Sequence, residues 1–197
     1  IGENGAVTSS SKHASQIGID VLENGGNAID AAIAVGFALS VTFPNAGNLG
    51  GGGFMVIRTS TGEVKTIDFR EVAPQNASRD MYLDENGDVI GGMSLYTAHA
   101  SGVPGTVAGF EYAHQKFGTK SWNYLLRPSI QLATNGFELS FRDAMYLNAS
   151  RSFFLRDEQA AEIFAAQDKY SVGDLFIQKD LAKTLRRISI GGADEFY

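Results

Sequence analysis

The 197-residue sequence contains no cysteine, which excludes disulfide bonds, cysteine-ligated zinc sites and a cysteine nucleophile. It also has no excess of basic residues: 22 acidic residues outnumber 16 basic ones, and the formal net charge is −6. Nucleic acid is therefore not an expected partner. No apolar run is long enough to span a membrane, because the most apolar stretch, residues 28–43, is broken by Asp30, Gly36 and Ser40. We accordingly expect no membrane contact.

Histidine is scarce, and the three residues present, His13, His99 and His114, have no metal-ligand spacing. We therefore predict no metal site. His13, near the start of a predicted helix, and His114, on a polar helix face, are interpreted as capping or solvated side chains. A supporting role for His99 in its loop stays open, although a structural role is favoured. Ser101 in the same loop lacks the G-x-S-x-G elbow, so a serine hydrolase has little support.

Glycine is locally abundant: "NAGNLGGGGFMVI" (45–57) places five glycines among positions 47–53. A dinucleotide-binding loop follows a strand and opens a helix, whereas here a predicted helix precedes the glycines and a predicted strand follows them. Met55 also stands where the third glycine of that fingerprint belongs, and no P-loop lysine is present. We predict a helix-to-strand corner in which backbone packs against backbone, and favour this over direct ligand contact.

Periodicity predicts an α+β chain in which strands come first and helices later. A hairpin is expected at 54–71, around the turn signal Thr61-Gly62. Asn27 is expected to N-cap a buried helix, with Asp30 at its N3 position. A strand is also expected at 5–11, and helices are expected over 11–24, 27–43, 104–118, 121–137, 140–168 and 174–192.

The length and the absence of linkers or repeats predict a single domain over residues 1–197. The chain begins at Ile1 without a signal peptide and ends on an apolar Phe-Tyr pair. We therefore expect a fragment or a proteolytic product.

Five segments, in this order, resemble the large subunit of gamma-glutamyltranspeptidases: "GNAIDAAIA" (26–34), "NLGGGGFM" (48–55), "DFREVAP" (68–74), "GVPGTVAGF" (102–110) and "GDLFIQKDLAKTL" (173–185). The resemblance implies the helix-rich large-subunit portion of a four-layer αββα sandwich, the fold of N-terminal-nucleophile hydrolases. It implies a precursor that cuts itself into two subunits. The nucleophile is then the N-terminal Thr of the small subunit, with its own α-amine as base. This chain would be an incomplete large subunit with no catalytic residue of its own.

The same resemblance implies gamma-glutamyl transfer to an amino acid or peptide, or hydrolysis by water, with glutathione or a similar donor and no cofactor. It implies a periplasmic or secreted location. It assigns one substrate-binding residue, Arg70, whose guanidinium would bind the α-carboxylate of the donor. A guanidinium is always charged and pairs with a carboxylate through two hydrogen bonds. Asp68 and Glu71 are expected to hold its side chain. On the sequence alone, a surface ion pair is the alternative.

Two other functions stay open. Within the same fold, the chain would belong to a related amidase, either a cephalosporin acylase or a poly-gamma-glutamate depolymerase. Outside it, the chain would be a stand-alone structural or binding module, because acyl transfer needs a nucleophile, a base and an oxyanion hole, and none is visible here.

Overall fold

The computed structural model describes residues 4–47 and 49–197. The N-terminal residue Ile1, and Asn48 in the glycine-rich loop, therefore lie outside the described residues. The chain separates into two compact units. One comprises the described parts of residues 1–48 together with 110–197, and the other comprises Leu49–Gly109. Helix α4 (Thr106–Phe117) crosses the boundary between them.

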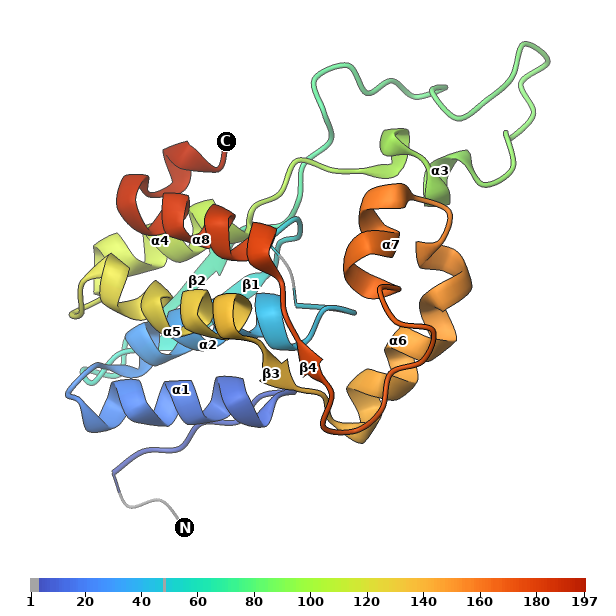
Figure 1. Cartoon of the computed structure of the whole chain (residues 1–197). Coiled ribbons are helices and arrows are strands. Elements are labelled where there is room, and N and C mark those ends of the chain that lie inside the picture. The colour runs from blue at the N-terminus through green and yellow to red at the C-terminus, as the bar shows by residue number, and fades with distance from the viewer. Residues whose placement is uncertain (1–3, 48) are drawn as a thin grey trace. The chain divides into compact units, whose positions relative to one another are not determined.

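Four helices of the first unit stack side by side in the order α1, α2, α5, α8 (Figure 1). They span Lys12–Glu23, Ala28–Thr42, Trp122–Asn135 and Lys179–Gly191. Ten of the fifteen residues of α2 are buried, because this helix is apolar on nearly every face and has neighbours on two sides. Its small residues permit close approach: a Cβ on Gly36 would lie 2.5 Å from the ring of Phe110.

The predicted helix over 140–168 is two helices, α6 (Phe141–Phe154) and α7 (Glu158–Phe164). The second begins anew because the Asp157 carboxylate accepts a hydrogen bond from the Ala160 N–H at 2.8 Å, the geometry of an N-cap. Two short strands, β3 (Phe137–Glu138) and β4 (Leu175–Phe176), pair antiparallel, and the turn η2 (Ala193–Glu195) follows α8.

The strand predicted at 5–11 is wrong. Residues 5–9 have no regular secondary structure, and no described segment pairs with them. A strand exists only through hydrogen bonds to a neighbouring strand, which a local sequence pattern does not supply.

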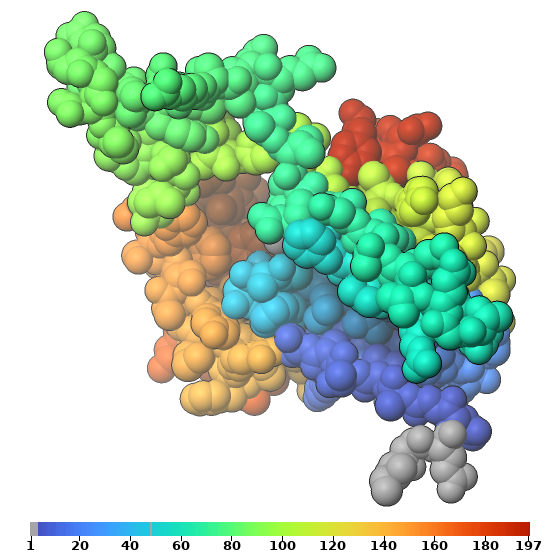
Figure 2. Space-filling view, turned by 180° about the vertical axis from the view of Figure 1, so that it is seen from behind, coloured from blue at the N-terminus to red at the C-terminus, as the bar shows by residue number. Residues whose placement is uncertain are grey.

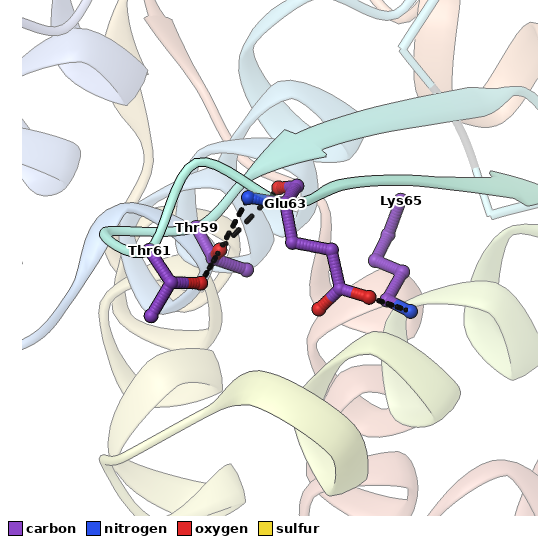
Figure 3. A network of polar contacts seen from close by, with 4 residues as sticks. All are labelled: Thr59, Thr61, Glu63 and Lys65. Carbon is purple, nitrogen blue, oxygen red and sulfur yellow. Dashed lines mark hydrogen bonds and ion pairs between the residues drawn. The ribbon is translucent and has the colours of Figure 1, made fainter.

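The second unit is built on an antiparallel hairpin of β1 (Phe54–Arg58) and β2 (Val64–Asp68), which confirms the predicted hairpin. Its turn is closed by Gly62, whose φ is +87° and whose N–H donates to the Thr59 carbonyl at 3.0 Å. The side chains of Thr59, Thr61, Glu63 and Lys65 add a polar network beside it (Figure 3).

One side of this hairpin is open to solvent. Its atoms, turquoise in Figure 2, face the viewer there, and Phe54, Val56 and Val64 are exposed. Beyond the hairpin the described residues of this unit include the short helices α3 (Met93–Tyr96) and η1 (Ala98–Ala100), two isolated β-bridges and the first residues of α4. The helix-rich chain with its two small sheets is α+β, as predicted.

Asp30 is fully buried at the start of α2, and its carboxylate accepts four hydrogen bonds. Its Oδ2 accepts from the Asn27 N–H at 2.9 Å and from the Thr119 hydroxyl at 2.5 Å. Its Oδ1 accepts from the backbone N–H of Thr119 at 2.9 Å and of Lys120 at 3.2 Å. The predicted N-cap is confirmed as a capping box. Asp30 additionally ties α2 to the loop between α4 and α5.

Replacing Asp30 is expected to destabilise the fold strongly. Asp30→Ala leaves three backbone N–H groups without their acceptor, and we expect the free energy of unfolding to fall by about 3 kcal/mol or more. Asp143→Ala is the matched control. Asp143 holds the same N3 position in α6, yet within the described chain its carboxylate bonds Ser140 alone. It should cost only about 1 kcal/mol. Urea unfolding of the variants checks both values, and equal losses would contradict the role given to the Thr119 loop.

The contribution of Asp30 should also depend on pH. Burial alone would raise the pKa of Asp30, but the hydrogen bonds from Thr119, Asn27 and Lys120 outweigh it, and the pKa lies below its ordinary value of 3.8. A carboxyl group whose pKa is lower in the folded than in the unfolded chain stabilises the fold at pH values above its pKa in the unfolded chain. The difference between the wild type and Asp30→Ala should therefore be constant at neutral pH and shrink as the pH falls below 3.8.

Candidate functional site

Arg70 lies two residues beyond the end of β2, and its guanidinium contacts the side chains of Glu71 and Phe54. Its Nε donates to Glu71 Oε2 at 3.1 Å, and its Cζ lies 5.8 Å from the centre of the Phe54 ring. Asp68 contacts the backbone instead, because its Oδ1 accepts from the Arg70 N–H at 3.0 Å. Of the two acidic neighbours expected to hold the side chain, Glu71 does so and Asp68 does not.

The rest of the Arg70 guanidinium is open. The side chain is 63% exposed, and within the described part of the chain neither Nη1 nor Nη2 has a hydrogen-bond partner. Hydrogen bonds from its own backbone and from Arg70 hold the pKa of Glu71 below its ordinary value, so the Glu71 carboxyl group is ionised at neutral pH. Glu71 thus accepts the hydrogen bond from Nε, and the N–H groups of Nη1 and Nη2 stay available. These two groups are able to donate parallel hydrogen bonds to the two oxygens of one carboxylate.

The glycine-rich loop packs against the segment that carries Arg70. Gly53 and Phe69 exchange backbone hydrogen bonds of 3.2 and 3.0 Å, which extends the hairpin ladder beyond its strands. A Cβ on Gly52 would lie 2.9 Å from Arg70 Cα and 2.8 Å from the nitrogen of Glu71. Because these are backbone atoms, no side chain fits at position 52 without moving the Arg70 segment.

A second glycine stretch, residues 102–109, packs against the same segment around Arg70. The Gly105 N–H donates to the Gly51 carbonyl at 2.8 Å, so the two glycine stretches are bonded to each other. A Cβ on Gly105 would lie 2.7 Å from the carbonyl carbon of Phe69 and 3.0 Å from the oxygen of Arg70. The predicted backbone corner is confirmed for the described residues of the loop, and three of the five recognised motifs meet at Arg70.

Alanine at either of these glycines should destabilise the unit. For Gly52→Ala and Gly105→Ala we expect losses of about 1–3 kcal/mol, since the added methyl group collides with backbone rather than with a side chain that rotates away. Gly91→Ala is the control, because nothing lies within 4 Å of its added Cβ and its φ is not positive. Thermal unfolding of the three variants measures these losses. A Gly52→Ala variant as stable as Gly91→Ala would contradict the close packing of the two glycine stretches against the Arg70 segment.

Two of the three histidines, His13 and His114, pack against aromatic side chains. His114 Nε2 lies 2.7 Å from the Lys120 carbonyl, and the ring packs on Trp122. The ring of His13 packs edge-on against Phe137, and its Nε2 is buried without a partner in the described chain, so the prediction of a capping or solvated His13 is wrong. His99 is exposed. In residues 4–47 and 49–197, no three His, Asp or Glu side chains are placed to hold a metal ion.

None of the helices in the described chain is both long and apolar enough to cross a membrane.

Solved structures with this fold define its class. The whole chain superposes on Helicobacter pylori gamma-glutamyltranspeptidase with a TM-score of 0.97 at 49% identity, and covers 57% of that chain. It also matches a cephalosporin acylase from Bacillus halodurans, with a TM-score of 0.80 and 26% identity over 93% of this chain and 35% of that one. The fold is that of the N-terminal-nucleophile hydrolases, and this chain is a helix-rich part of their four-layer αββα sandwich.

Within that class the family is defined by sequence. The family model described as Gamma-glutamyltranspeptidase matches residues 14–197, and the chain belongs to this family. A curated relative, the glutathione hydrolase proenzyme of Pseudomonas sp. (strain A14), is 49% identical over 197 residues, which are 99% of this chain and 34% of that protein. The chain thus spans about a third of the length of this relative.

Proposed function

We propose that this chain is part of an enzyme that transfers or hydrolyses gamma-glutamyl groups, and that Arg70 binds the α-carboxylate of the donor. The observation that carries the proposal is the Arg70 guanidinium itself, which is ion-paired at Nε and open at both terminal nitrogens. The relative named glutathione hydrolase supports glutathione or another gamma-glutamyl amide as donor. An amino acid, a peptide or water is the acceptor, and no cofactor takes part.

We further infer that the chain, although it separates into two compact units, is a single domain and an incomplete large subunit, with the small subunit of the same precursor as its partner. The proenzyme name of the relative and its threefold greater length support this arrangement. Acyl transfer through a covalent intermediate needs a nucleophile and a base, and an N-terminal Thr supplies both through its hydroxyl and its α-amine. A periplasmic or secreted location belongs to the same proposal.

A related amidase activity is the second candidate, supported by the structural match to a cephalosporin acylase. Gamma-glutamyl transfer is favoured over it, because the identity is 49% to the transpeptidase and 26% to the acylase.

Sequencing the N-termini of the chains formed from the full-length protein tests the proposed precursor. We expect a second chain that begins with Thr, and we expect replacement of that Thr by Ala to stop both cleavage and turnover of a gamma-glutamyl amide. Turnover by an uncut precursor, or undiminished turnover by the Ala variant, would contradict the proposal.

A further inference from the structure

Phe54 lies beside Arg70 because of the register of the hairpin. Phe54 pairs with Asp68 across the two strands, and the ladder continues with Gly53 opposite Phe69. Position 52 therefore stands opposite Arg70. Since side chains alternate along a strand, Phe54 and Arg70 are diagonal neighbours on one face of the hairpin.

Glycine opposite Arg70 leaves room for this contact. Gly52 has no side chain to stand against the guanidinium, so the diagonal Phe54 ring is the side chain of the first strand that reaches it, with 5.8 Å between Cζ and the ring centre. A guanidinium within about 6 Å of a ring centre is attracted to the negative face of the ring. Two contacts of different kinds therefore hold this guanidinium: the Glu71 carboxylate at Nε and the Phe54 ring.

We propose that Phe54 is a positioning residue for the donor α-carboxylate, acting through Arg70. This inference rests on the proposed role of Arg70. A long, exposed arginine samples many rotamers, and ordering it on binding lowers affinity. Phe54 and Glu71 order it beforehand, with Nη1 and Nη2 left for the ligand. This role also accounts for the exposure of the Phe54 side chain, which is apolar and yet 64% accessible in this chain.

Three variants of the full-length protein separate this role from simple packing. Phe54→Leu keeps an apolar side chain but removes the ring, and Phe54→Tyr keeps the ring face. Val56→Ala is the matched control. Val56 lies on the same face of the same strand, is 73% exposed, and pairs with Thr66, farther along the hairpin from Arg70 than Phe54.

The expected result is a change in KM. For gamma-glutamyl-p-nitroanilide, Phe54→Leu should raise KM about three- to tenfold with little change in kcat, as expected for lost ground-state binding. Phe54→Tyr and Val56→Ala should stay within about twofold of the wild type. In an Arg70→Ala background, Phe54→Leu should raise KM no further, because there is no guanidinium to position. KM does not depend on the fraction of active protein, so partial misfolding does not mimic the effect.

The outcomes distinguish this inference from the proposed function. If Arg70→Ala leaves the kinetics unchanged, the role of Arg70 fails, and that of Phe54 fails with it. If Arg70→Ala is severely impaired while Phe54→Leu keeps the wild-type KM, only the inference about Phe54 is overturned. It is also overturned if Phe54→Tyr loses as much as Phe54→Leu, or if only the ring-keeping variant yields folded protein, because Phe54 then serves packing.

Discussion

Arg70→Lys in the full-length protein is expected to lower kcat/KM for gamma-glutamyl-p-nitroanilide about ten- to a hundredfold, although the positive charge is kept. Lysine has no planar fork, so the two-oxygen grip on the α-carboxylate is lost. A charge-assisted hydrogen bond contributes about 1.5–3 kcal/mol, and about 1.4 kcal/mol corresponds to a factor of ten in rate. An ammonium group also lacks an Nε to pair with Glu71 as Arg70 does. Steady-state kinetics measures the loss.

Arg70→Ala should lose more, because the carboxylate then meets no positive partner. The loss should shrink for a donor that lacks the α-carboxylate, since the wild type cannot use that contact either. Arg58→Lys is the control, because Arg58 is an exposed arginine at the end of the neighbouring strand β1. Folded Arg70 variants that stay within about twofold of the wild type would show that Arg70 is only a surface ion-pair residue.

The 197-residue chain by itself is expected to release no p-nitroaniline from gamma-glutamyl-p-nitroanilide. It contributes the arginine proposed to bind the carboxylate, whereas the nucleophile, the base and the oxyanion hole of acyl transfer are assigned to the proposed small subunit. The full-length protein, purified in the same way, should turn the substrate over. Activity that co-elutes with the purified chain would overturn the division of roles between the two subunits.

Most of the fold could be predicted from local sequence patterns. The turn residue Gly62 and the alternating runs around it gave the hairpin, and Asn27 with Asp30 gave the start of α2. Structural features that depend on residues far away in the sequence could not be predicted. Residues 5–9 look like a strand but have no described neighbour to pair with. Three of the four hydrogen bonds to the Asp30 carboxylate come from a loop 89 and 90 residues away.

The candidate site shows the same division. Arg70 came from the family resemblance, and Glu71 as its partner came from adjacency in the sequence. The role proposed for Phe54 was missed, because counting back symmetrically from the Thr61-Gly62 turn places Phe54 opposite Phe69, whereas in the structure it pairs with Asp68. The meeting of Gly52 with Gly105 around Arg70 had no local signal, because it depends on how the chain returns after a long loop.

A crystal structure of the full-length protein with bound glutamate tests the central claim most directly, because it shows which group holds the α-carboxylate. We expect both Arg70 Nη atoms to lie about 2.7–2.9 Å from the two carboxylate oxygens, with Glu71 still bonded to Nε and the Phe54 ring still against the guanidinium. A glutamate whose α-carboxylate is held by other residues, with Arg70 turned away from it, would contradict the account.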